Sequence, residues 1–154
     1  MRIIFRLLLI YLLFLIQTAV ARPSLDLVLL GLVIFALHDP PSYALITAIW
    51  AGFLLGLVNP ISIGFHITVL TAIAFACNNI RRIIYKNIFY FLSIVFFALL
   101  FKYLLSLIFL RGGPNFLTWL VSITIILVIA IPIESLIINI FYQQWRMKAS
   151  EENY

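Results

Sequence analysis

Long apolar stretches run through this chain, and only short polar connections interrupt them. The stretch from Phe116 to Tyr142, for example, contains a single charged residue, Glu134. A helix needs about 20 apolar residues to cross the roughly 30 Å hydrocarbon core of a bilayer. Backbone groups in lipid must find hydrogen-bond partners within the chain, and the strict alternation of apolar and polar residues that marks barrel strands is absent here. The sequence therefore predicts a helical membrane protein.

Composition supports this prediction. Of the 154 residues, 66% are hydrophobic and 10% are charged, whereas soluble domains have about 45–50% apolar and about 25% charged residues. Disordered chains are also excluded, because they are poor in apolar residues. The single cysteine, Cys77, cannot form a disulfide within one chain and is expected to be buried.

Proline and polar residues divide the chain into six expected helices. The break at His38–Pro41 is the strongest in the first half, because its two prolines remove hydrogen-bond donors, and we expect His38 and Asp39 to form a solvated turn. The second helix is shorter than a full span, so it is tilted, extended by flanking residues or partly buried in protein. A transmembrane domain over residues 1–142 thus precedes a polar cytoplasmic tail over 143–154. The expected spans are 3–20, 25–37, 43–58, 61–77, 88–110 and 116–142.

The basic residues predict the orientation, since Lys and Arg accumulate in cytoplasmic connections. With both termini in the cytoplasm, seven basic residues lie toward the cytoplasmic side and two toward the outside. An alternative for the first helix is a cleaved signal peptide ending near Ala19-Val20-Ala21, but its apolar stretch exceeds the usual 7–15 residues, so we expect it to remain. The inward residues are Arg2, Arg6, Arg81, Arg82, Lys86, Arg146 and Lys148; the outward ones are Arg22 and Arg111.

Four small residues recur at every fourth position of the third expected helix: Ala44, Ala48, Gly52 and Gly56. Small residues allow helices in lipid to approach closely, which supplies much of their association energy. This stripe is either a packing surface within the bundle or the docking surface for a partner helix, from another protein or from a second copy.

Charged residues inside spans are expensive and should face protein or water. Asp26 is expected in the first turn of the second helix, where the helix dipole favours negative charge, or at an interface on the outer surface. Glu134 lies within the last span, and its depth favours an ion pair with Arg6. Lys102 is expected to extend its ammonium outward to the membrane surface instead.

The sequence contains no pattern that indicates catalysis. His38, Asp39 and His66 lack the spacing of metal ligands, and neither a nucleophile with its base nor a phosphate-binding glycine loop is present. The basic residues form no nucleic-acid-binding pattern. We therefore expect a protein that is not an enzyme, takes no cofactor or metal and binds no nucleic acid.

The segment from Arg22 to Arg82 contains an ordered series of motifs: Arg22-Pro23 before an apolar run, the break at His38–Pro41, the string Ala51–Leu57, Ile63-Gly64 and the basic pair Arg81-Arg82. This order resembles the MreD family of bacterial rod-shape-determining proteins. In that family the second span starts with a motif like Arg22-Pro23-Ser24-Leu25, and an acidic residue usually stands where this chain has Asn59.

This resemblance implies a six-helix bundle like the S-components of vitamin transporters, placed in the bacterial inner membrane. It also implies a non-enzymatic part of the cell-wall elongation machinery that binds the single-span protein MreC. Through MreC it would connect to MreB filaments, the glycosyltransferase RodA and a class B penicillin-binding protein; a homodimer is a further option. The alternative is a substrate-binding subunit of a vitamin-type transporter, whose candidate polar residues are Asn59, Ser62 and His66.

Overall fold

The computed structural model describes residues 2–19, 26–58, 62–84, 88–110 and 115–151, and for some of these it describes the backbone alone. The described residues form six helices and no strand, which confirms the all-α fold class. The helices are α1 (Arg2–Ala19), α2 (Leu27–His38), α3 (Pro41–Val58), α4 (Ile63–Ile84), α5 (Ile88–Leu110) and α6 (Phe116–Glu151).

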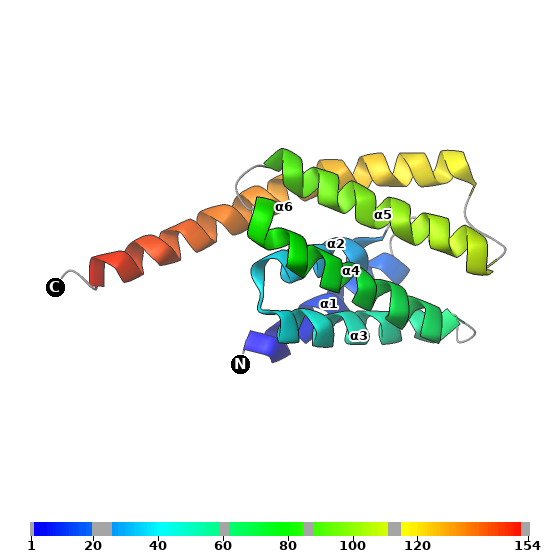
Figure 1. Cartoon of the computed structure of the whole chain (residues 1–154), viewed down its shortest axis with the longest axis horizontal. Coiled ribbons are helices and arrows are strands. Elements are labelled where there is room, and N and C mark those ends of the chain that lie inside the picture. The colour runs from blue at the N-terminus through cyan, green and yellow to red at the C-terminus, as the bar shows by residue number, and fades with distance from the viewer. Residues whose placement is uncertain (1, 20–25, 59–61, 85–87, 111–114, 152–154) are drawn as a thin grey trace.

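Successive helices run in opposite directions, so the start of α1 and the end of α6 lie at the same end of the bundle (Figure 1). Helices α1 to α4 pack against one another, and α5 and α6 form a hairpin beside them. Helix α2 joins the two groups, because it contacts each of the other five helices. We call the end with the two termini the terminal end, and the other the connection end.

Helix α2 is the centre of the core. It has twelve residues, so it is about 18 Å long, and no polar side chain interrupts it before His38. A helix that is apolar all round is buried on all sides, and nine residues of α2 are buried: Val28, Leu29, Leu30, Gly31, Leu32, Val33, Ile34, Ala36 and Leu37.

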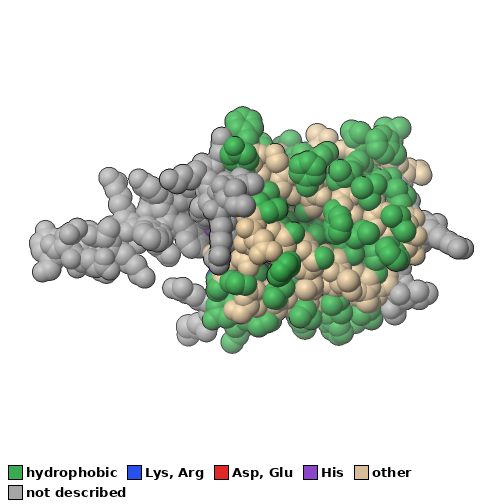
Figure 2. Space-filling model, in the orientation of Figure 1, with side chains coloured by type: hydrophobic (Ala, Val, Ile, Leu, Met, Phe, Trp, Pro, Cys, Tyr) green, Lys and Arg blue, Asp and Glu red, His purple; other side chains and the backbone are tan. Residues whose placement is uncertain are grey.

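Four helices are long and apolar enough to cross a membrane: α3, α4, α5 and the first part of α6. Helices α1 and α2 are shorter apolar helices. Large hydrophobic side chains such as Phe5, Phe97 and Leu117 are more than half exposed, and hydrophobic groups spread over the visible face of the bundle (Figure 2). A surface of this kind suits contact with lipid rather than water, so the chain has the character of a membrane protein.

Several helix boundaries differ from the predicted spans. Helix α3 starts at Pro41 rather than Tyr43, since proline suits the first turn of a helix. Helices α4 and α6 continue into residues that were assigned to a polar connection and a polar tail, because polar residues end a span without ending a helix. Helix α6 also changes direction part-way along (Figure 1); it contains Pro132, and a proline inside a helix removes a backbone hydrogen bond and kinks it.

Candidate functional site

The N-terminus of α2 is held by two side chains that accept hydrogen bonds from its first turn. Asp26 is the N-cap, and its Oδ1 accepts from the backbone N–H of Leu29 at 3.2 Å. Gln17 of α1 accepts from the N–H of Val28 at 3.0 Å through Oε1. The first N–H groups of a helix have no partner within it, so these bonds satisfy donors that would otherwise be unpaired inside the bundle.

Asp26 also forms an ion pair with Lys102 of α5. The Lys102 Nζ donates to Oδ2, the carboxylate oxygen that does not cap the helix. Both side chains are largely buried, with 16% of Lys102 and 13% of Asp26 exposed. The prediction that Asp26 starts the second helix is correct, whereas the prediction that Lys102 reaches outward to the membrane surface is wrong.

The C-terminus of α2 carries a second ion pair. Asp39 is the C-cap of α2, and its Oδ1 accepts a hydrogen bond from Nη2 of Arg6 on α1. Only 4% of the Asp39 side chain is exposed. The Arg6 guanidinium also lies over the ring of Tyr43, 5.6 Å from its centroid, a distance at which a cation is attracted to an aromatic face.

The expected solvated turn at His38 and Asp39 is therefore wrong. The reason is the length of α2: a helix of about 18 Å inside a bilayer core of roughly 30 Å keeps at least one of its ends below the membrane surface. His38 is not solvated either: it is half-buried, and its Nδ1 lies 2.8 Å from the carbonyl oxygen of Ile34.

The two ion pairs differ in their relation to the α2 dipole. A carboxylate at the N-terminus of a helix is stabilised by the dipole, and a carboxylate at the C-terminus is destabilised by it. Asp26 therefore has two favourable partners, the helix terminus and Lys102. Asp39 lies between the unfavourable C-terminus of α2 and the favourable N-terminus of α3, so the two dipoles oppose each other at its carboxylate.

Four of the predicted site residues lie partly or wholly outside the described part of the chain. Arg22, Pro23 and Asn59 are among the residues that it does not describe, and Glu134 is described by its backbone alone. Arg6 Nη1 is buried without a hydrogen-bond partner among the described residues. The Arg6–Glu134 pair therefore stays a prediction, although Arg6 already has a partner in Asp39.

The small-residue stripe of α3 packs within the chain. Ala44, Ala48, Gly52 and Gly56 are all buried. A Cβ atom added to Gly52 would lie 2.5 Å from Cα of Ile67, and one added to Gly56 would lie 2.8 Å from Cα of Ile63. Both neighbours belong to α4, so the two glycines serve the close contact of α3 with α4, as in other close-packed membrane helices, and are not exposed to a partner.

His66 of α4 is half-buried. Its ring packs edge-on against Phe65, with 5.5 Å between centroids, and its Nδ1 is buried without a hydrogen-bond partner among the described residues. No group of three or more His, Cys, Asp or Glu residues that could hold a metal ion occurs in the described part of the chain.

These contacts make a structural frame. Two largely buried acid–base pairs, each between residues more than 30 positions apart in the sequence, hold α2 to α1 at one end and to α5 at the other. Breaking one member of a buried pair leaves an uncompensated charge at a cost of about 3–5 kcal/mol. The arrangement therefore fixes the relative positions of the helices.

Comparison with known proteins found no matching family model, no matching curated protein and no matching solved structure.

Proposed function

We propose that this chain is a scaffold of the MreD type, which acts in cell-wall elongation by binding other membrane proteins and without catalytic turnover. The proposal rests on where the motifs that resemble the MreD family lie in the fold. The string Ala51–Leu57 contains Gly52 and Gly56, and Gly56 meets Ile63 of the Ile63-Gly64 motif. The residues that carry the resemblance are thus residues that join α3 to α4.

The partner in this proposal is an MreC-like protein with one membrane span. Because Gly52 and Gly56 are occupied by α4, that span is expected to bind one of the exposed apolar faces instead. The outward face of α1 is one such surface, with Ile4 and Leu8 each more than 60% exposed. Through this partner the chain would act with MreB filaments, RodA and a class B penicillin-binding protein.

The proposed location is the bacterial inner membrane, with both termini in the cytoplasm. The basic residues predict this orientation, and the two termini share one end of the bundle (Figure 1). An even number of crossings fits both observations.

Depletion in a rod-shaped host tests the function. Loss of the protein should turn rods into spheres, and the wild-type chain should restore the rods. A tagged chain should also co-purify the MreC-like protein of the same organism in mild detergent. Normal rods after complete depletion, together with no co-purification, would overturn the proposal.

The same preparation tests the alternative transporter subunit. Such a subunit should bind a small vitamin-type molecule in isolation, measurable by calorimetry, and cells lacking it should lose uptake of that molecule while keeping their shape. Among the described residues, the cavity between α4 and α5 is lined almost entirely by apolar side chains, which does not favour a polar substrate there.

A further inference from the structure

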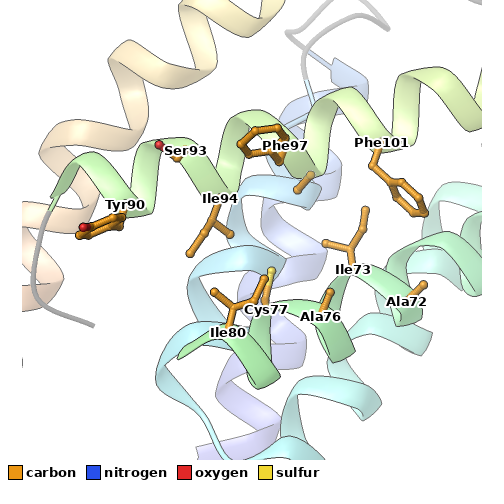
Figure 3. A pocket seen from close by; sticks show the side chains of 11 residues that line it. Ala72, Ile73, Ala76, Cys77, Ile80, Tyr90, Ser93, Ile94, Phe97 and Phe101 are labelled. Carbon is orange, nitrogen blue, oxygen red and sulfur yellow. The ribbon is translucent and has the colours of Figure 1, made fainter. Parts of the chain in front are cut away.

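A hydrophobic cavity of about 400 Å³ lies between α4 and α5. The side chains from the two helices face each other across it, with Ile73 and Cys77 on α4 opposite Ile94 and Phe97 on α5 (Figure 3). Three alanines, Ala72, Ala76 and Ala98, also line the cavity, and their small side chains leave the space open.

The cavity has the length of one leaflet. It extends along α5 from Tyr90 to Phe101, which is about 16 Å of helix. This distance is about half of the roughly 30 Å hydrocarbon core. It begins near the terminal end, where α4 ends and α5 starts (Figure 1), and stops near mid-depth.

The polar groups of the cavity lie toward that same end. Tyr90 is 53% exposed at the start of α5, and the Ser93 hydroxyl donates within α5 to the carbonyl oxygen of Phe89 at 2.8 Å. The sequence places Arg81 and Arg82 directly after Ile80, the last α4 residue of the cavity. Positive charge at the end of an apolar cleft between membrane helices is the pattern that attracts anionic lipid headgroups.

We propose that the cavity between α4 and α5 binds one acyl chain of an anionic phospholipid, with the headgroup phosphate at the Arg81-Arg82 end. The shape of the cavity favours this occupant. It is about 16 Å long, lined almost entirely by apolar side chains and ends near mid-depth, as expected for a chain that enters from one leaflet.

Photo-crosslinking in vesicles tests the proposal. The full chain is reconstituted in phosphatidylcholine with a trace of phosphatidylglycerol that carries a diazirine on its acyl chain. Adducts, mapped by mass spectrometry, should concentrate on cavity residues such as Ile94 and Phe97. Unlabelled phosphatidylglycerol should suppress them much more effectively than added phosphatidylcholine. Adducts spread evenly over the outer faces of all helices would overturn the site.

Variants of α4 provide the matched comparison. Ala76→Phe fills the cavity and should lower the adduct yield at least several-fold, whereas Thr68→Phe, at an exposed position of α4 outside the cavity, should leave it unchanged. If Ala76→Phe does not elute as the wild type does in size-exclusion chromatography, Ala72→Phe replaces it. Equal yields from filled and control variants contradict the proposal.

The arginines test the headgroup. Each arginine near the membrane surface is expected to favour an anionic lipid by roughly fivefold, so Arg81→Gln and Arg82→Gln together should remove most of the preference for phosphatidylglycerol while adducts still form at Phe97. Equal competition by both lipids in the wild type would overturn the anionic assignment. Crosslinks from the cavity to a second protein chain would identify a helix as occupant and overturn the proposal. Neither result depends on whether the chain acts in cell shape.

Discussion

Lys102 of α5 donates a hydrogen bond to Asp26, the residue that also caps the first turn of α2. One carboxylate therefore meets a cation through one oxygen and a helix terminus through the other. The two residues are 76 positions apart in the sequence. Their contact fixes the central helix to the α5–α6 hairpin.

The double role of Asp26 predicts a graded series of variants. Asp26→Ser keeps a good N-cap and loses the charge, whereas Asp26→Ala loses both. Since a lost N-cap costs about 1 kcal/mol, Asp26→Ala should be the less stable of the two by about that amount. The free energy of unfolding in detergent–SDS mixtures measures the difference. An Asp26→Ser variant as stable as the wild type would show that Lys102 contributes nothing.

The Arg6–Asp39 pair should matter more than the Lys102–Asp26 pair, because Asp39 is the more deeply buried carboxylate, with 4% of its side chain exposed against 13% for Asp26. Arg6→Met and Asp39→Asn should each lower the unfolding free energy by about 3–5 kcal/mol, and Lys102→Met should cost less than Arg6→Met. The same unfolding measurement gives the ranking.

A double-mutant cycle tests whether this pair acts as a unit. The double variant Arg6→Met with Asp39→Asn should lose less unfolding free energy than the two single variants lose in total, by about 1–3 kcal/mol. Strictly additive losses are incompatible with a direct interaction. Tyr43→Leu, which removes the ring beneath Arg6, should cost a smaller amount, about 0.5–2 kcal/mol.

Gly52 and Gly64 are expected to respond differently when each is replaced by alanine. Gly52→Ala places a methyl group against the backbone of Ile67, which cannot move alone, so α3 and α4 must separate; overpacking of this kind costs about 1–3 kcal/mol. A Cβ at Gly64 meets nothing within 4 Å, so Gly64→Ala should be neutral or stabilising by up to about 1 kcal/mol through helix propensity. Thermal melting in detergent compares them, and equal stability of the two variants would contradict the close α3–α4 contact.

Reporter fusions test the predicted orientation. Green fluorescent protein fused after Tyr154 should fluoresce, and alkaline phosphatase at the same place should be inactive. Phosphatase inserted between Gly112 and Gly113 should be active, because α5 ends and α6 starts at the end of the bundle opposite the termini (Figure 1). An active phosphatase after Tyr154 reverses the orientation.

The helices could be predicted from the sequence, because apolar runs and proline breaks are local signals. Pro40 and Pro41 separate α2 from α3, and Asp26, which was expected in the first turn of the second helix, is its N-cap. The largest differences are at the ends of α4 and α6, because polar residues that end a span do not end a helix.

The ion pairs could not be predicted by treating the helices as full spans at one level. That assumption placed Asp39 in water and Lys102 at the membrane surface. The signal that could have found both pairs is the shortness of the second apolar run. Asp26 and Asp39 stand at the ends of a helix that is too short to keep both of them at the membrane surface. A carboxylate below the surface needs a cation as its partner. Lys102 lies about 12 Å from the end of α5, which is the depth of the N-terminus of α2. Arg6, in the first turns of α1, lies at the depth of the C-terminus of α2.

The order of synthesis gives the Lys102–Asp26 contact a consequence for biogenesis. α2 leaves the ribosome well before α5. Asp26 therefore has no Lys102 to pair with until α3, α4 and most of α5 have been synthesised. A half-finished chain therefore carries a charged, short helix that lipid disfavours, and the nascent protein is expected to keep that helix near the translocon or a membrane insertase until α5 emerges. Truncation before Lys102 should yield a product that quality-control proteases remove.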